Sequence, residues 1–186
     1  MKKLNLGSGD KKIPGFINVD KYNTFNPDVV HDLEIFPYPF YNDEVDEIKL
    51  IHVLEHIGQT PNTFIKIIKE LYRICCNEAK IHISVPHPRH DDFLADPTHV
   101  RPITTLGLSL FDLEQNEQWK KIGAANTPLA IIHKVNFKII KNEIILDPKY
   151  ENLLNKKKIS KKELLEIIEK YNNVIRQTNY ILKVIK

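Results

Sequence analysis

The sequence is poor in cysteine and has no long apolar run, and each absence excludes a class of protein. Its two cysteines, Cys75 and Cys76, are neighbours in the chain. Adjacent cysteines rarely bridge each other, so we expect no disulfide framework and a reducing compartment. No segment approaches the ~18 consecutive apolar residues that predict a membrane span. The two lysines near the N-terminus precede no apolar signal region, so we expect a cytoplasmic protein without a membrane partner.

A large excess of charge of one sign is also lacking. The 186 residues carry 27 Lys and Arg against 24 Asp and Glu, a formal net charge of +3. Lysines crowd residues 156–162, which is typical of a solvated start of a helix. Because no basic and aromatic pattern accompanies them, we expect a small-molecule substrate and no nucleic-acid partner. The length suits one domain with a sizeable core, and the oligomeric state stays open.

Glycine is scarce, but its distribution is uneven. Three of the six glycines, Gly7, Gly9 and Gly15, fall in the first fifteen residues. The apolar segment 3–6 (KLNL) predicts a strand that runs directly into Gly7-Ser8-Gly9. Glycine allows backbone amides to approach a ligand closely, and such amides bind anionic or polar groups. Taken alone, this pattern predicts only a tight turn.

Apolar runs and one clear helix alternate along the first half of the chain. Thr60 and Pro61 predict the start of a helix. The predicted strands after the first are 16–19, 28–31, 47–53 and 79–85. Such alternation predicts an α/β domain with a largely parallel sheet that helices cover on both faces.

The second half of the chain is less regular. Residues 86–130 are rich in His, Asp and Pro, with one short helix expected near 106–113. Long irregular segments are usually lids or binding loops. The tail 131–186 predicts strand, helix and strand, with Ser160 and Glu163 as a capping box. We therefore expect one domain over 1–186, with 1–85 binding a cofactor, 86–130 forming a substrate loop and 131–186 completing the sheet.

Two of the predicted strands end in aspartate. Asp20 closes the second strand, where a carboxylate accepts both hydroxyls of a ribose, and Asp32 closes the third. Ligands of open α/β sheets bind at the carboxyl ends of strands where the strand order reverses. Together with the glycine turn, the two aspartates predict a nucleoside pocket.

A nicotinamide dinucleotide is the obvious competitor, and the spacing argues against it. The dinucleotide fingerprint requires a third glycine, but Lys12 occupies that position. The acidic residue of that fingerprint lies ~20 residues after the first glycine, whereas Asp20 is only 13 residues after Gly7. A cofactor without a pyrophosphate fits better.

Five segments together resemble class I S-adenosylmethionine (SAM)-dependent methyltransferases. They read LNLGSG, GFINVD, DVVHDLEIFPYPF, DEVDEIKLIHVLEHI and HISVP. The later run DPTHVRPIT also resembles the loop that follows the fifth strand in this family, so that the resemblance covers residues 3 to about 105. The chain is most similar to the short, type 11-like group that is often linked to polysaccharide or secondary-metabolite biosynthesis. The resemblance implies a Rossmann-like, mostly parallel seven-stranded sheet with helices on both faces and an antiparallel C-terminal strand.

The resemblance also implies SAM as the cofactor and assigns residues to it. The expected cofactor-binding residues are Leu6, Gly7, Ser8, Gly9, Asp20, Asp32, Leu33 and His52. Two features depart from the family. Asn5 stands near the place of an acidic residue before the glycine turn, and the segment between Gly9 and Phe16 leaves little room for the usual helix.

Six of the eight histidines lie between positions 52 and 99. The segment from His52 to His56 contains H-x-x-E-H, an inverted zinc-peptidase motif, but that motif belongs inside a helix and His52 is expected to end a strand. Some small-RNA ribose methyltransferases are similar here, and the resemblance matches Glu55 and His56 to residues that hold magnesium, with His87 or His90 completing a site. Magnesium prefers oxygen ligands. We therefore predict no metal site and leave metal dependence as an alternative to a hydrogen-bonded Glu55–His56 pair.

The segment after the fifth predicted strand concentrates polar residues that suit an acceptor site. Histidine titrates near neutrality and suits removal of a proton from a hydroxyl or amine. The predicted bases are His56, His87, His90 and His99, and the predicted substrate-binding residues are Asp96 and Arg101. The alternative is that Asp96 forms a turn, with His99 and Arg101 locking the loop.

These observations predict a SAM-dependent methyltransferase that acts on an oxygen or nitrogen of a small polar acceptor, such as a sugar or polysaccharide precursor. Two other functions stay open. One is a non-catalytic SAM-fold binding or regulatory protein, and the other is an enzyme that uses a different nucleotide.

Overall fold

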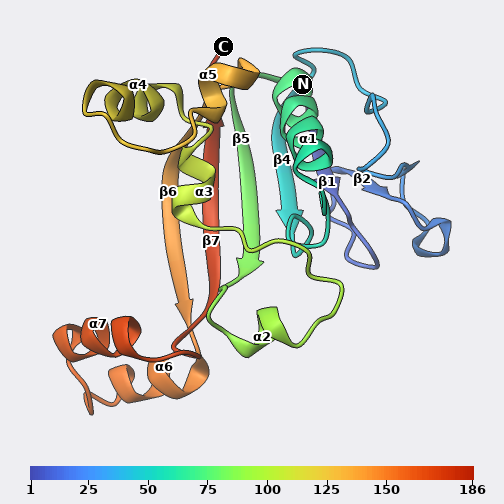
Figure 1. The fold of residues 1–186 in the computed structure, drawn as a ribbon. Coiled ribbons are helices and arrows are strands. Elements are labelled where there is room, and N and C mark those ends of the chain that lie inside the picture. Colours follow the sequence, from blue (N-terminus) through green and yellow to red (C-terminus); the bar gives the residue numbers. More distant parts are fainter.

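Seven strands form one sheet in the order β3-β2-β1-β4-β5-β7-β6 in the computed structural model, which describes residues 1–186 (Figure 1). The first five strands run parallel, and β7 pairs antiparallel with both β5 and β6. The strands are β1 (Lys2–Leu6), β2 (Ile17–Asp20), β3 (Val29–Val30), β4 (Val45–Ile51), β5 (Cys75–Pro86), β6 (Phe137–Leu146) and β7 (Ile175–Val184). The predicted Rossmann-like, mostly parallel seven-stranded sheet is confirmed.

Short helices connect these strands. They are the 3-10 helix η1 (Asn23–Phe25) and the α-helices α1 (Pro61–Ile74), α2 (Asp91–Leu94), α3 (Thr105–Ser109), α4 (Leu113–Lys121), α5 (Leu129–His133), α6 (Pro148–Asn155) and α7 (Lys161–Lys170). The Thr60 side chain accepts a hydrogen bond from the Thr63 amide and caps α1, as predicted. The capping box of Ser160 and Glu163 is also present at the start of α7.

Helices cover the two faces of the sheet unequally. On one face α1 packs over β4 and β5, and α3 lies against β6 (Figure 1). The buried residues of this face come from both the strands and α1: Leu4, Leu6, Ile48, Leu50, Ile81, Ile83, Ile67, Ile68 and Leu71. This face holds most of the hydrophobic core, and its burial is the main favourable term in folding.

The opposite face of the sheet is mostly polar. One row of paired residues crosses β1, β4, β5 and β7 on this face, and none of its members is buried: Lys3, Glu47, Lys80 and Lys183. The chain from Gly7 to Phe16 crosses between β1 and β2 without a helix, as its length suggested. Alternate strand positions point to opposite faces, so a face without covering helices carries lysine and glutamate instead of leucine.

A buried network of amides replaces the missing helix. The Asn5 Nδ2 donates to the Lys11 carbonyl at 3.0 Å and to the Asn18 Oδ1 at 3.0 Å. The same Asn18 oxygen accepts from the Ile13 amide at 2.8 Å. Asp28 Oδ2 accepts from both the backbone amide and the Nδ2 of Asn18, at 2.7 and 2.8 Å. Asn5, the predicted departure from the family, therefore anchors the segment that follows the glycine turn.

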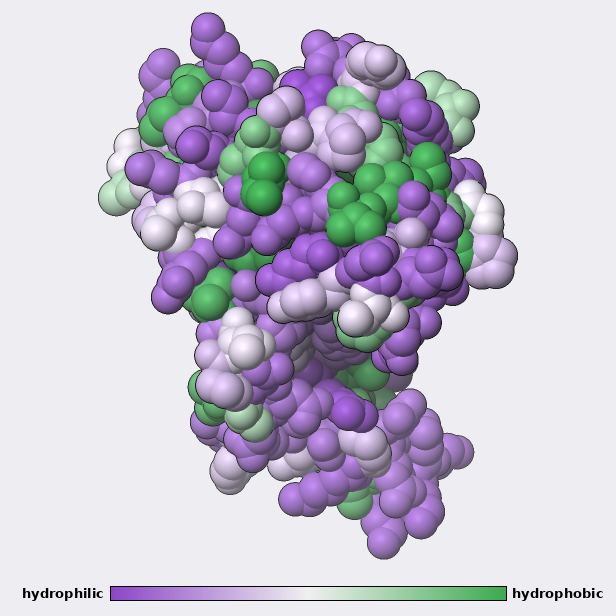
Figure 2. Space-filling view, turned by 90° about the vertical axis from the view of Figure 1, so that its right-hand side faces the viewer, coloured by the Kyte–Doolittle hydropathy of each residue, from purple (hydrophilic) through white to green (hydrophobic).

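Both chain ends lie at the same edge of the molecule. β1 starts and the antiparallel β7 ends at the amino ends of the parallel strands, away from their carboxyl ends (Figure 1). At the other end, α6 and α7 form a hairpin whose surface is largely hydrophilic at the bottom of Figure 2. Leu164 is the one buried residue of these two helices. No helix in the molecule has the length and apolar character that crossing a membrane requires.

Candidate functional site

A cavity of about 420 Å³ lies at the carboxyl ends of β1, β2 and β4 and beside the chain that follows β3. Small-molecule sites commonly have this size. Six of the eight predicted cofactor residues line it: Gly7, Gly9, Asp20, Asp32, Leu33 and His52. The other two, Leu6 and Ser8, are buried beside it. The glycine turn and both predicted aspartates thus meet at one cavity.

The glycine turn is fixed to the end of β2. The amides of Gly7 and Ser8 both donate to the Val19 carbonyl, at 2.8 and 3.0 Å. Gly7 has a φ of +68°, and a Cβ at this position would lie 2.6 Å from Cγ2 of Val53. Only glycine fits such a contact with a positive φ. The turn therefore packs directly against the chain after β4.

Asp20 connects the turn to the cavity. Its Oδ2 accepts from the Gly9 amide at 2.8 Å, and its Oδ1 accepts from the Tyr22 amide at 2.9 Å. The residue is buried, so these bonds fix its orientation. An ionised carboxylate has about four acceptor sites, so two remain for hydroxyl groups of a ligand.

Three carboxylates line the cavity and make it acidic. Asp32 Oδ1 accepts from the Glu34 amide at 2.9 Å. The Oε1 of Glu34 accepts from the Gly58 amide at 2.6 Å, which joins this segment to the turn before α1. With Asp20, these side chains give the cavity an excess of negative charge, which favours a ligand that carries positive charge.

Two aromatic residues at the cavity escaped the sequence analysis. Tyr22 precedes η1 and Phe25 is its last residue. The two side chains are 55% and 41% exposed, and their ring centroids lie 6.2 Å apart. Exposed aromatic rings at a cavity suit stacking on a planar base. The signal that could have found them is a Tyr and a Phe within five residues after Asp20, in a segment too polar to form a strand. His31, Ile57 and Thr98 are further lining residues that we did not predict.

His52 has strained backbone geometry at the end of β4. Its φ is +55°, which is unusual for a residue other than glycine and common at functional sites. A contact with Glu55 raises the pKa of His52, and its Nε2 lies 3.1 Å from Gln177 Oε1. Residues 52–57 form turns and not a helix, so the inverted zinc-peptidase motif lacks its required setting.

Glu55 is deeply buried beside the cavity. Its side chain is 1% exposed, and neither carboxylate oxygen has a hydrogen-bond partner. His52 Nδ1 lies 3.4 Å from Oε1, an ion-pair distance, without the geometry of a hydrogen bond. The amide of Val100 donates to the Glu55 carbonyl at 2.9 Å. This contact brings the loop after α2 back over the turn.

That loop places His99 next to Glu55 and His56. One potential ligand atom from each of the three residues lies within 4.8 Å of the others. The sequence had suggested His87 or His90 as the third member of such a group, and this was wrong, because neither of them joins the cluster. The contact of His99 with Glu55 and His56 depends on the path of the loop after α2, and the spacing of these residues in the sequence does not predict that path.

The predicted acceptor residues do not share one place. His87 lines a different cavity with Arg89 and Asn142. His90 is buried, and its Nδ1 accepts from the Asp92 amide at 3.0 Å, which caps α2. Of the four predicted bases, only His56 lines the acidic cavity, and His99 lies next to it.

Asp96 forms hydrogen bonds within its own loop and does not line the acidic cavity. Its Oδ1 accepts from both the hydroxyl and the amide of Thr98, at 2.7 and 2.8 Å, and these bonds lower its pKa. Thr98 in turn contacts His56. Asp96 thus forms the turn that the sequence offered as an alternative, and its predicted role in substrate binding stays a prediction.

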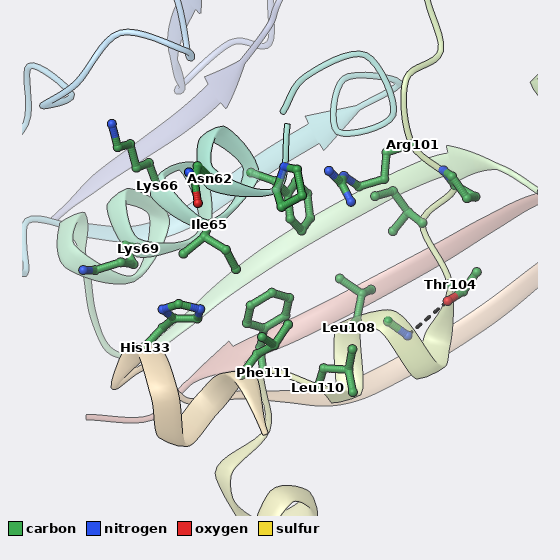
Figure 3. A pocket seen from close by; sticks show the side chains of 16 residues that line it. Asn62, Ile65, Lys66, Lys69, Arg101, Thr104, Leu108, Leu110, Phe111 and His133 are labelled. Carbon is green, nitrogen blue, oxygen red and sulfur yellow. Dashed lines mark hydrogen bonds between the residues drawn. The ribbon is translucent and has the colours of Figure 1, made fainter. Parts of the chain in front are cut away.

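Arg101 lines a different cavity, and its predicted role in substrate binding stays a prediction. Its guanidinium lies 4.2 Å from the centre of the Phe64 ring and donates to the Gly58 carbonyl. Figure 3 shows it in a second cavity of about 620 Å³ between α1, α3 and α5, with Lys66 and His133. This cavity is larger, but it has no carboxylate and no glycine turn. The predicted cofactor residues therefore meet at the smaller, acidic cavity and not at this one.

Comparisons with known proteins agree on the fold. No protein-family model matches the chain, and no curated protein matches it in sequence. Among solved structures, a SAM-dependent methyltransferase from Archaeoglobus fulgidus is 17% identical, with a TM-score of 0.62 over 98% of this chain and 85% of that one. A SAM-dependent methyltransferase from Methanosarcina mazei is 13% identical, with a TM-score of 0.57 over 99% and 92%.

A third similar structure was solved with SAM bound. It is phosphoethanolamine N-methyltransferase 2 from Haemonchus contortus, 12% identical, with a TM-score of 0.51 over all of this chain and half of that one. At these identities the comparisons establish the fold, which is that of class I SAM-dependent methyltransferases.

Proposed function

We propose that the chain is a SAM-dependent methyltransferase. The observation that carries this proposal is the meeting of the glycine turn, Asp20 and Asp32 at one acidic cavity in a sheet of this strand order. Fold alone does not imply function, so the proposal depends on the chemistry of the cavity.

The residues present fit SAM part by part. The two free acceptor sites of Asp20 suit the hydroxyls of a ribose. Asp32 and Leu33 lie beside the exposed rings of Tyr22 and Phe25, which suits an adenine. Gly7 and Gly9 line the cavity with backbone atoms, which suits the polar end of a methionine tail.

The charge of the cavity separates SAM from a dinucleotide. SAM carries a positive sulfonium, whereas a nicotinamide dinucleotide carries a negatively charged pyrophosphate. The three carboxylates favour the first and repel the second. This electrostatic preference is independent of the glycine spacing, which leads to the same conclusion.

The sulfonium of bound SAM supplies an electrophilic methyl group. The glycine turn, Asp20 and Asp32 would hold SAM, and methyl transfer would leave S-adenosylhomocysteine and release one proton from the acceptor. The task of this chain is then to bind, orient and exclude water. Positioning of this kind lowers a barrier by roughly 7–11 kcal/mol. His56 lines the cavity with Glu55 and His99 beside it, and we place this residue next to the acceptor.

We further propose that the acceptor is a small polar molecule that is methylated on oxygen or nitrogen, such as a sugar or polysaccharide precursor. The support is the polar lining of the cavity next to the histidine cluster. The net charge of +3 gives no basis for nucleic acid as the acceptor.

Calorimetric titration with SAM, S-adenosylhomocysteine and NADH tests the cofactor. We expect binding of the first two and none of NADH. Asp20→Ala should weaken S-adenosylhomocysteine binding by roughly 10–100-fold, because it removes acceptors for two ligand hydroxyls. Asp10→Ala is the matched control, since Asp10 lies in the same turn but is exposed and outside the cavity. Tight NADH binding, or equal affinity in the two variants, would contradict the proposal.

Turnover separates an enzyme from a non-catalytic SAM-binding protein. With isotopically labelled SAM and a pool of small polar metabolites, we expect the label to pass to an acceptor. His56→Ala should lower kcat by roughly 10²-fold or more while the affinity for SAM holds. SAM binding without any label transfer would favour a regulatory protein.

A further inference from the structure

We propose that Glu55, His56 and His99 bind a divalent transition-metal ion beside the acidic cavity. One ligand atom from each residue lies within 4.8 Å of the others. Atoms bound to one zinc ion at 2.0–2.2 Å lie at most about 4.4 Å apart. Small rotations of the side chains therefore bring the three atoms into ligand positions.

The carboxylate of Glu55 is the first sign of a missing partner. The side chain is 1% exposed, and both oxygens lack a hydrogen-bond partner. Burying a charged group without a partner is costly, so buried charges are paired or coordinate metals. The Nδ1 of His52 lies 3.4 Å from one of these oxygens and makes no hydrogen bond to it. A cation between Glu55 and the two histidines would satisfy it.

Hydrogen bonds fix the tautomer of His56. The Thr98 hydroxyl donates its one hydrogen to Asp96 Oδ1 at 2.7 Å. The same hydroxyl lies 2.9 Å from His56 Nδ1, so it accepts a hydrogen bond from that nitrogen. In the neutral ring, Nε2 then keeps a free lone pair. Metal-binding histidines almost always have their second nitrogen hydrogen-bonded in this way.

His99 has the same arrangement. Its Nδ1 lies 2.7 Å from the Phe93 carbonyl, which can only accept, so the nitrogen is the donor. Phe93 also stacks on the imidazole, with the ring planes 18° apart. Both imidazoles thus donate a hydrogen bond from Nδ1, and neither Nε2 has a hydrogen-bond partner. The Nε2 of His99 also lies 3.9 Å from Asp96 Oδ2.

The ligand set indicates which metal fits. Two imidazoles and one carboxylate suit zinc, manganese, iron or cobalt, whereas magnesium prefers a shell of oxygen atoms. Three protein ligands leave at least one position open for water or a substrate. Because His56 and Thr98 also line the acidic cavity, that position is accessible from the cavity side. Only this last role, contact with an acceptor, rests on the proposed function.

The test uses the full chain and needs neither SAM nor an acceptor. Protein freed of metal with EDTA and then desalted is titrated calorimetrically with Zn²⁺, Mn²⁺ and Mg²⁺. We expect one Zn²⁺ and one Mn²⁺ to bind per chain, with Mg²⁺ much weaker. Absence of Zn²⁺ and Mn²⁺ binding to the wild type would overturn the proposal, and Mg²⁺ binding as tight as Mn²⁺ would overturn the assignment to a transition metal.

Substitutions test whether these three residues are the ligands. Glu55→Gln and His99→Asn should each weaken Zn²⁺ binding by more than the ~10–100-fold that loss of an outer partner costs. His87→Ala is the matched control, because it removes a histidine of the same loop that does not join the cluster. Equal weakening by the control, or full binding in both ligand variants, would show that the ion binds elsewhere.

Thermal unfolding gives a second readout that does not depend on titration heats. Zn²⁺ should raise the Tm of the wild type and of His87→Ala, because an ion that binds only the folded state stabilises it. The rise should be absent in His99→Asn and in His56→Ala. A similar rise in all variants would overturn the site. Failure of SAM binding with these results intact would leave the metal site standing and contradict only the proposed function.

Discussion

Gly7 and Gly9 flank one serine, yet their surroundings differ. Both have a positive φ, +68° and +49°. A Cβ on Gly7 would lie 2.6 Å from Val53, whereas a Cβ on Gly9 would meet nothing within 4 Å. The two positions therefore separate backbone strain from steric conflict.

We expect Gly9→Ala to cost about 1–2 kcal/mol of unfolding free energy from the left-handed backbone alone. Gly7→Ala should cost clearly more, because Val53 must also move. Urea denaturation of the two variants measures the difference. Equal destabilisation would mean that the turn relaxes freely and does not pack on Val53.

At this scale the sequence predicts single residues well when their partners are close in the chain. The glycine turn and Asp20 could be predicted because their spacing and order along the strands are local signals. His99 could not be joined to Glu55, since 44 residues separate them and the path of the loop decides the contact.

Among the elements, the segment between β1 and β2 is held by hydrogen bonds that end at the carboxylate of Asp28. Backbone and side-chain hydrogen bonds from Asn18 lower the pKa of Asp28. A group whose pKa is lowered by folding stabilises the protein above its unfolded pKa of about 3.9. That contribution is lost as the pH falls through the lower, folded value.

Asp28→Asn should therefore lower the Tm at pH 7, and its deficit relative to the wild type should shrink as the pH falls below about 4. Thermal unfolding followed by circular dichroism across this range measures the deficit. A deficit of constant size at every pH would show that the carboxylate charge does not contribute.

The sequence predicted most elements because strands and caps carry local signals. Thr60 with Pro61, the box at Ser160, and the apolar runs of β1, β2, β4 and β5 all formed. The helix α6 was missed, since Asp147 and Pro148 read as the end of a strand although Asp147 caps this helix. Because α6 buries no residue, its sequence has no apolar stripe that would predict a helix.

At the scale of the whole molecule, packing is concentrated on one face of the sheet. α1 buries five residues against the strands, whereas α6 buries none and α7 buries one. Segments with few buried apolar contacts open at low free-energy cost. Residues 148–170 should therefore exchange amide hydrogens much faster than α1 and β5, as measured by mass spectrometry. Protection of the hairpin equal to that of α1 would contradict this.

The sequence analysis predicted helices on both faces of the sheet, and it missed their unequal coverage for a physical reason. A strand that alternates apolar and polar residues can face either solvent or the polar side of another element. Lys49 and His82 pair across β4 and β5 on the uncovered face, and both are half-buried. Neither residue type indicates in the sequence whether a helix covers that face.

The position of the chain ends has a practical consequence for the binding experiments. Both ends emerge from the side of the sheet that lies farthest from the mouth of the acidic cavity (Figure 1). An affinity tag or a surface tether can thus be fused to either end without crowding that mouth. A chip-bound protein would present its pocket outward to nucleosides in the flow.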